Sequence, residues 1–211
     1  MASFEIERSI LKQNHGLIAG VDEAGRGSLF GPVVAAAVIL PADWMRRPVR
    51  GWLSRVNDSK LLSPARRREL AGRILTGAVA VGVGFATNRE IDDKNIYWAS
   101  LDAMKRAVAN LTEKPDFVLL DGFKNRADAF GCPQLGVTGG DGKSYSIAAA
   151  SIVAKVVRDE MMDVFDGFFD GYHLARNKGY GTPDHYLALG AKGPSALHRR
   201  SFNLGAPAEA S

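Results

Sequence analysis

Short apolar runs alternate along the chain with polar segments that are rich in glycine, a pattern typical of a domain with both strands and helices. Two runs of β-branched residues and alanine, at residues 17–21 and 33–40, flank a glycine-rich segment, which predicts a hairpin of two strands. Further strands are predicted at residues 78–87, 117–120 and 135–137. We therefore expect a sheet of five strands at the centre of an α/β fold.

Helices are predicted at residues 63–75, 96–108 and 144–162, and from residue 183 onward. The first begins with serine followed by proline, a pair typical of a helix start. The third carries a face of alanine and serine side chains, which are small enough to lie close against a sheet. The segment 41–55 is rich in arginine and is predicted to be a surface loop.

At 211 residues, with 46% hydrophobic and 24% charged residues, the chain is long enough for one domain with its own core. It shows neither a signal peptide nor an apolar run of the roughly 20 residues of a spanning helix, so we expect no membrane association. Cys132 is the single cysteine, which excludes an intrachain disulfide and a zinc site built from thiolates. These features predict a cytoplasmic protein, expected to be a monomer, with a frayed tail at residues 205–211.

Basic residues are clustered, although the formal net charge is a modest +4. Arginines and lysines gather at residues 46–50, 55–60, 66–68 and 199–200, which permits a polyanionic partner without requiring one. The run 66–68 is predicted to be a solvated helix face. The histidines show no metal-ligand spacing, and we expect structural or surface roles for them. They are His15, His173, His185 and His198.

Carboxylates follow two of the predicted strands. Asp22 and Glu23 end the first strand, and Asp121 ends the fourth. Because the carboxyl ends of neighbouring strands meet in one crevice of an α/β sheet, we expect these side chains to converge. Asp141 precedes the helix predicted at residues 144–162, whose dipole would favour its ionised form. Converging carboxylates repel one another unless a divalent cation neutralises them, and oxygen ligands suit Mg²⁺ or Mn²⁺ better than zinc.

Six short strings, in the same order along the chain, closely resemble the bacterial ribonuclease HII family, the type 2 ribonucleases H. They lie at residues 20–27 (GVDEAGRG), 57–60 (NDSK), 121–122 (DG), 148–155 (AAASIVAK), 178–180 (KGY) and 198–202 (HRRSF). The resemblance spans roughly residues 17–204 and implies a single ribonuclease H-like domain over residues 1–211. Its fold would be a five-stranded mixed sheet flanked by helices, with a C-terminal helical extension.

The resemblance implies an endonuclease that hydrolyses RNA in RNA–DNA hybrids and cuts 5′ of ribonucleotides embedded in duplex DNA. Such an enzyme serves ribonucleotide removal from DNA and RNA primer removal. Its metal-binding acids fall on Asp22, Glu23 and Asp121, and they imply hydrolysis with two Mn²⁺ or Mg²⁺ ions that leaves a 5′-phosphate. The fourth acid is expected at Asp141, although a glycine precedes it here where the family often has lysine. Asp159, on the long predicted helix, is the alternative.

Residues for substrate recognition also follow from the resemblance. Gly25, Arg26 and Gly27 match the segment that contacts the ribose 2′-hydroxyl, and glycines there permit close approach of the backbone. Tyr180 matches a tyrosine that stacks on the next deoxyribose, and Lys60 matches a lysine that contacts phosphate. The string at residues 198–202 is a family marker whose role does not follow from the sequence.

Two other functions remain compatible with these features. A non-catalytic protein that binds RNA–DNA hybrids would keep the fold and the basic surface, but it should lack at least one metal-binding carboxylate. Another nuclease of the same fold, such as a resolvase or transposase, would also group acids at these strand ends. The Gly-Arg-Gly segment and Tyr180 favour the ribonuclease H interpretation.

Overall fold

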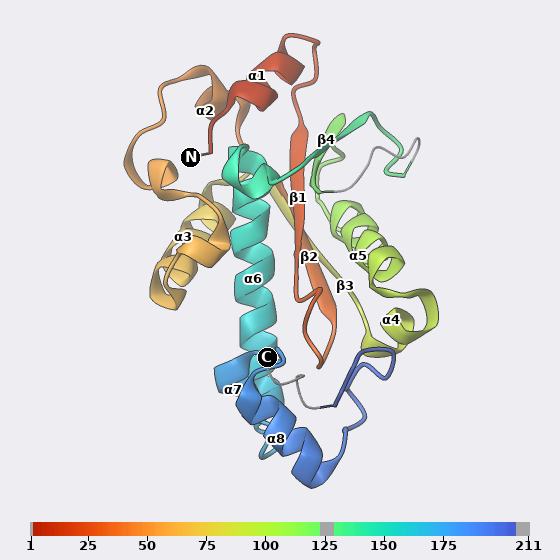
Figure 1. Ribbon diagram of the computed structural model, residues 1–211. Helices are drawn as coiled ribbons and strands as arrows, with labels where there is room; N and C mark the ends of the chain where they lie inside the picture. Colours follow the sequence, from red (N-terminus) through yellow and green to blue (C-terminus); the bar gives the residue numbers. More distant parts are fainter. Residues whose placement is uncertain (1, 123–128, 206–211) are drawn as a thin grey trace.

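The computed structural model describes residues 2–122 and 129–205, and its centre is a mixed five-stranded sheet (Figure 1). The sheet order is β3-β2-β1-β4-β5. β1 pairs antiparallel with β2 and parallel with β4, β2 is antiparallel to β3, and β4 is parallel to β5. The predicted mixed sheet is thereby confirmed. The strands are β1 (Ile18–Ala24), β2 (Val33–Ile39), β3 (Ala80–Ala86), β4 (Phe117–Asp121) and β5 (Gln134–Val137).

Helices cover both faces of the sheet. The long helix α6 runs along one face, α4 and α5 lie on the other, and α7 and α8 form a C-terminal extension beyond one end of α6 (Figure 1). The helices are α1 (Glu5–Leu11), α2 (Ala42–Arg46), α3 (Pro64–Gly77), α4 (Asn88–Lys94), α5 (Ile96–Ala109), α6 (Tyr145–Asp166), α7 (Leu174–Asn177) and α8 (Pro183–Lys192). Short 3₁₀ helices lie at Gly51–Arg55, Ser59–Leu61 and Gly140–Gly142.

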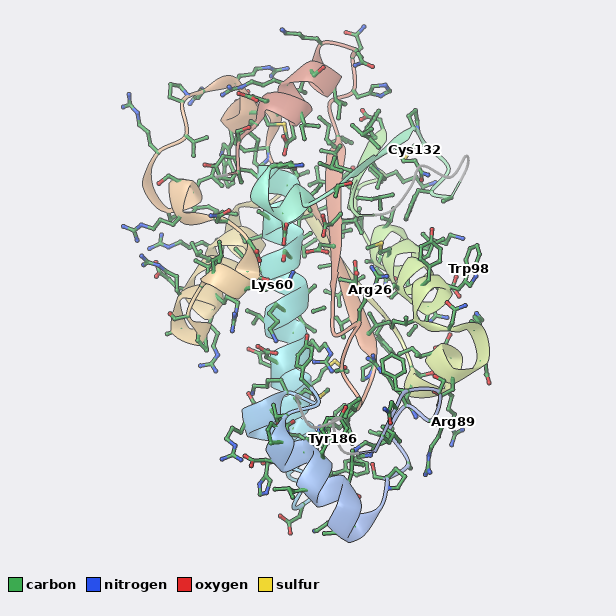
Figure 2. All side chains as sticks on the ribbon, viewed as in Figure 1. Arg26, Lys60, Arg89, Trp98, Cys132 and Tyr186 are labelled. Carbon is green, nitrogen blue, oxygen red and sulfur yellow. The ribbon has the colours of Figure 1, made fainter. Side chains whose placement is uncertain are left out.

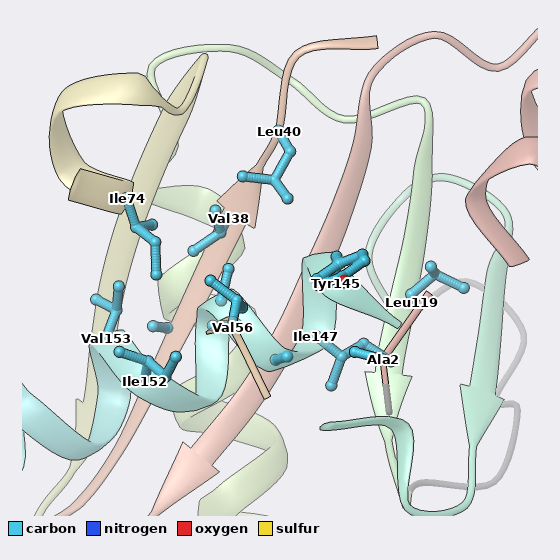
Figure 3. Close-up of a cluster of buried hydrophobic side chains, with 14 of the residues drawn as sticks. Ala2, Val38, Leu40, Val56, Ile74, Leu119, Tyr145, Ile147, Ile152 and Val153 are labelled. Atoms are coloured by element: carbon cyan, nitrogen blue, oxygen red, sulfur yellow. The ribbon is translucent and has the colours of Figure 1, made fainter. Parts of the chain in front are cut away.

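The close packing of α6 on β1 depends on small residues from both elements. A Cβ atom at Gly20 would lie 2.0 Å from the carbonyl carbon of Ser146, so no larger residue fits there without moving the helix. The alanine-rich face of α6 is buried, as its composition predicts, and packs with side chains of α3 and the sheet (Figure 3). This contact brings the N-terminal half of α6 next to the carboxyl ends of β1 and β4.

The opposite face of the sheet is packed in the same way against α5. Cβ atoms at Gly82 and Gly84 of β3 would come within 2.1 and 2.4 Å of backbone oxygens of α5. Alternate residues of β1, such as Ala19 and Val21, are buried on this side. The remaining β1 positions, including Asp22, therefore point toward α6, because successive strand residues face opposite sides of a sheet.

The prediction of a surface loop for residues 41–55 was wrong. This segment forms α2 and a 3₁₀ helix, and it buries Met45 and Leu53. Its apolar positions are too few for a recognisable helical period, and tertiary contacts stabilise it: Arg8 of α1 donates a 2.6 Å hydrogen bond to the carbonyl of Met45. The helix α1 was not predicted at all. Residues 206–211 of the predicted tail lie outside the described residues.

No helix within residues 2–122 and 129–205 is both long and apolar enough to cross a membrane.

Candidate active site

Two of the predicted acids lie side by side at the ends of adjacent parallel strands. The register pairs Val21 of β1 with Leu120 of β4, so the next residues, Asp22 and Asp121, are neighbours. Both belong to the face of the sheet that α6 covers, and Asp22 is 5% exposed. The register thus brings Asp22 and Asp121 together as predicted, whereas Glu23 is not in the group of described carboxylates that could share one metal ion.

Asp141 reaches the same place from the turn that precedes α6. Gly139 has a left-handed backbone with φ of 63°, which turns the chain into the 3₁₀ helix Gly140–Gly142. The amide of Gly140 donates a 2.6 Å hydrogen bond to Oδ1 of Asp121, and this bond ties the turn to β4. Carboxylate oxygens of Asp22, Asp121 and Asp141 all lie within 4.8 Å of one another.

Asp159, the alternative fourth acid, has other partners. Its carboxylate lies 2.6 Å from Nζ of Lys155, one turn earlier on α6, and 3.8 Å from Nη2 of Arg67 on α3. The structure therefore brings Asp141 into the acidic cluster and places Asp159 in an ion-pair network between two helices.

Without a cation, burial and mutual repulsion of the ionised carboxylates in the acidic cluster lower the stability of the folded protein. Burial raises the pKa of Asp22 well above its ordinary value, and the charges of Glu23 and Asp121 raise it further. The pKa of Asp141 is also raised, first by burial and then by Asp121. The dipole of α6 was expected to favour the ionised form of Asp141, but the pKa of this carboxyl is raised overall, by desolvation and by the neighbouring carboxylate. Ser144, not Asp141, caps α6 by accepting a hydrogen bond from the amide of Ile147.

Glu23 borders the cluster and holds an unused acceptor. One carboxylate oxygen accepts a 3.2 Å hydrogen bond from Arg26, while the buried Oε2 has no hydrogen-bond partner among the described residues. Burial raises its pKa as well. An orphaned buried oxygen beside three converging carboxylates is the donor set that hard divalent cations prefer. These residues therefore fit a divalent metal ion.

The turn at residues 25–27 is held from beneath by a buried arginine. Gly25 has φ of 91°, and a Cβ atom there would lie 1.9 Å from Nε of Arg158, so glycine is required for both backbone and space. Arg158 is fully buried and donates hydrogen bonds to Oγ of Ser28 and to the carbonyls of Phe30, Pro32 and Lys178. Sequence reasoning considered this residue only as the neighbour of Asp159 and missed its contact with the turn.

The acids Asp22 and Asp121 and the 25–27 turn line a pocket with a volume of about 260 Å³. Tyr180 and Lys60 also line this pocket. Tyr180 lies next to the end of the 25–27 turn, because its backbone forms an antiparallel bridge with Ser28. Lys60 is exposed (Figure 2), and its Nζ lies 3.9 Å from Asp141. Burial alone would lower the pKa of Lys60, but Asp58 and Asp141 outweigh it and raise the pKa.

Three further side chains line this pocket and were not predicted. Lys155 places its Nζ 5.3 Å from the centre of the Tyr180 ring. Ser151 hydrogen-bonds to Asp22 and lies 2.9 Å from Oγ of Ser59, which joins α6 to the 3₁₀ helix at residues 59–61. Ser151 and Lys155 are one turn apart on α6, so the helical spacing was the signal that could have found them.

Two basic residues from the clusters in the sequence are buried, and one of them belongs to the run predicted to be a solvated helix face. Arg67 donates hydrogen bonds to the carbonyls of Ser59 and Leu62, so the run 66–68 is not wholly a solvated face. Arg199 is fully buried and donates to the carbonyls of Gly31 and Arg26. Charged residues with several carbonyl acceptors can be buried at an acceptable cost, which composition alone does not reveal.

Comparisons with known proteins agree with this geometry. The family model described as Ribonuclease HII matches residues 19–204. A curated ribonuclease HII of Moorella thermoacetica is 51% identical over 201 residues, which cover 95% of this chain and 93% of that protein. A ribonuclease HII from Archaeoglobus fulgidus, solved in complex with PCNA, superposes with a TM-score of 0.74 at 25% identity, covering 92% of this chain and 98% of that one. The ribonuclease H2 of Pyrococcus horikoshii shares the fold, with a TM-score of 0.71 at 24% identity, covering 89% of this chain and 94% of that one.

Proposed function

This chain belongs to the ribonuclease HII family and is a nuclease of the ribonuclease H type, and on that premise we propose how its site works. We propose that it cleaves RNA in RNA–DNA hybrids and cuts 5′ of single ribonucleotides embedded in duplex DNA, leaving a 5′-phosphate. One observation carries the proposal. Asp22 and Asp121 line the same pocket as the 25–27 turn and Tyr180, and carboxylate oxygens of Asp22, Asp121 and Asp141 lie within 4.8 Å of one another.

The four acids Asp22, Glu23, Asp121 and Asp141 are proposed to hold the metal ions. Two divalent ions, Mn²⁺ or Mg²⁺, would lower the pKa of the attacking water and offset the charge that grows on the leaving 3′ oxygen. The protein contributes position: the strand register fixes Asp22 and Asp121, and the bond from Gly140 to Asp121 fixes the turn that bears Asp141. Asp159 is proposed to orient Lys155 through its ion pair and to bind no metal.

Recognition of the ribose is proposed to come from the turn and from Tyr180. The backbone at Gly25 and Gly27 has no side chain in the way of a 2′-hydroxyl, which is the group that distinguishes RNA from DNA. Tyr180 lines the same pocket as that turn, and its ring is proposed to stack on the following deoxyribose. Exposed Lys60 is proposed to contact a phosphate, which the raised pKa of its ammonium group favours.

The cellular setting is also a proposal. A single cysteine, Cys132, is compatible with a reducing compartment, so we propose cytoplasmic action as a monomer on nucleic acid. Sedimentation at micromolar concentration would measure one chain per particle if this is right, and a stable dimer would refute it.

The deciding experiment is cleavage of end-labelled duplex DNA that contains one ribonucleotide, with Mn²⁺, with Mg²⁺ and with EDTA. An all-DNA duplex of the same sequence is the control. Metal-dependent cutting 5′ of the ribonucleotide, with a 5′-phosphate on the product, would support the proposal. Binding without cutting would favour a hybrid-binding protein, and cutting of the all-DNA control would favour a different nuclease of this fold.

A further inference from the structure

Two buried histidines of the C-terminal extension face each other behind Tyr180. His185 lies on α8 and His198 in the segment that follows it, and neither is exposed to solvent. Their Nε2 atoms are 3.1 Å apart, which is hydrogen-bond distance. The sequence predicted structural roles for these histidines without indicating that they meet.

The outer partners of the two rings determine where each proton lies. Nδ1 of His198 is 2.9 Å from the amide nitrogen of Ser195, which can only donate, so this Nδ1 accepts. Nδ1 of His185 is 2.9 Å from the carbonyl oxygen of Tyr180, which can only accept, so this Nδ1 donates. In the neutral forms His198 therefore carries its proton on Nε2 and donates it to Nε2 of His185.

The four groups thus form one directed chain of hydrogen bonds from the Ser195 amide through His198 and His185 to the Tyr180 carbonyl. The Tyr180 backbone also accepts from the amide of Thr182 and bridges to Ser28 beside the 25–27 turn. We propose that His185 and His198 act as a neutral positioning pair that sets where Tyr180 stands, and thereby how well the enzyme recognises a ribose-to-deoxyribose junction. This inference rests on the proposed function of Tyr180.

An added proton would break this chain at either ring. A proton on Nδ1 of His198 would remove the bond from the Ser195 amide and leave only the Ser195 hydroxyl, also 2.9 Å away, as an acceptor. A proton on Nε2 of His185 would point at the donating Nε2 of His198. Burial lowers the pKa of both histidines, that of His198 to about 4, and the partner ring contributes at His198. Arg200 also lowers the pKa of His198, and His173 lowers that of His185. The other titratable or charged groups packed around the pair are Tyr172, Tyr180, Arg199 and, beyond Arg200, Asp92.

Two isosteric variants of His185 separate its two hydrogen bonds. His185→Asn keeps a donor near the Nδ1 position, which can reach the Tyr180 carbonyl, but loses the group that faces His198. His185→Gln keeps a group at the Nε2 position and loses the donor to Tyr180. The readout is the ratio of kcat/KM on a single embedded ribonucleotide to kcat/KM on a continuous RNA–DNA hybrid.

We expect His185→Gln to lower this ratio by about tenfold, the equivalent of one lost hydrogen bond, and His185→Asn to change it by less than about threefold. Adding Tyr180→Ala to His185→Gln should lower the ratio no further than Tyr180→Ala alone, because the histidine acts through that tyrosine. Equal ratios in the two His185 variants, or additive losses in the double variant, would overturn the proposal.

Nitrogen-15 NMR of the wild-type histidine rings tests the pair without any substrate. The chain has four histidines, and at pH 7 the ring of His185 should be protonated on Nδ1 and the ring of His198 on Nε2, with His198 neutral down to about pH 5. The reverse tautomers, or protonation of either ring near pH 6.5, would refute the positioning pair. If the wild-type protein cuts no single ribonucleotide, the proposed function fails, whereas the tautomers still decide whether the pair exists.

Discussion

Buried charge of both signs borders the turn at residues 25–27, and the two environments differ. We call Asp22, Asp121 and Asp141 the acidic cluster, and Arg158 with its hydrogen-bond acceptors the basic cluster. In the acidic cluster, carboxylate oxygens of Asp22, Asp121 and Asp141 lie close enough together to bind one metal ion. Burial raises the pKa of Asp22 and of Asp141. In the basic cluster, Arg158 is equally buried, but each of its side-chain nitrogens donates to an oxygen of the protein. The hydrogen bonds of the arginine side chain are all satisfied by the protein, whereas the charge of the carboxylates must be neutralised by a bound cation.

This difference separates a binding site from a scaffold. Buried charge with satisfied hydrogen bonds contributes to stability when it is present and costs stability when it is removed. Buried carboxylates that repel one another cost stability until a ligand arrives, which is common at functional sites. Substitutions in the two clusters should therefore have opposite effects on stability and on activity.

The largest expected effect is on turnover in the acidic cluster. Asp22→Asn should abolish metal-dependent cleavage while leaving the fold and duplex binding intact. In EDTA its melting temperature should equal or exceed that of the wild type, because the substitution removes a buried charge next to Glu23 and Asp121. Cleavage assays and thermal unfolding measure the two effects. Asp43→Asn, at an exposed acid on α2, is the matched control and should retain turnover, and full activity of Asp22→Asn would refute the site.

Arg158→Met should have the opposite profile, with a large loss of stability. Hydrogen bonds to charged groups contribute about 1.5–3 kcal/mol each, so losing several should lower the free energy of unfolding by about 3 kcal/mol or more. For a chain of this size that corresponds to a melting temperature lower by roughly 6–12 °C. Arg89→Met, at an exposed arginine labelled in Figure 2, is the control and should change little. Equal melting temperatures would show that Arg158 is not a structural charge.

Metal binding should stabilise the protein through the acidic cluster. At a free Mn²⁺ concentration about 100 times Kd, the free energy of unfolding should rise by about 2.7 kcal/mol. The increase should be much smaller in Asp22→Asn and unchanged in Arg89→Met. Denaturant unfolding with and without Mn²⁺ makes the comparison, and an equal increase in all three proteins would place the ion elsewhere.

The histidine pair should make stability fall in mild acid. Between pH 6.5 and pH 5 an unfolded histidine binds a proton while folded His198, with a pKa of about 4, does not, so the unfolded state gains the proton and stability decreases as pH falls. The contribution over this interval is about 1.6 kcal/mol. Denaturant unfolding in EDTA at pH 6.5 and pH 5 measures this decrease. The free energy of unfolding should fall by that amount more in the wild type than in His198→Asn. The same loss in both would contradict a neutral His198.

The strands and the convergence of Asp22 with Asp121 could be predicted from the sequence, whereas the burial of Arg158 could not. Apolar runs that end in Asp22 and Asp121 indicate adjacent strand ends, and the register of the sheet does bring these acids together. The choice between Asp141 and Asp159 depends on the left-handed turn at Gly139, which no periodicity reveals. The burial of Arg158 could not be predicted, because all but one of its oxygen acceptors are backbone carbonyls, which identify no residue type.

The smallest predicted effect concerns Lys60, the exposed cation next to the acidic cluster. Its side chain is 79% exposed and its Nζ lies 3.9 Å from Asp141, so it contributes little to stability. If it contacts a phosphate, Lys60→Ala should weaken binding of hybrid and of junction duplex alike, and it should reduce the slope of log binding constant against log salt by about 1. Lys12→Ala, at an exposed lysine at the end of α1, is the control and should leave the slope unchanged. An unchanged slope for Lys60→Ala would mean that the ammonium group of Lys60 contacts no phosphate. Its role would then be to offset the negative charge of the acidic cluster through Asp141.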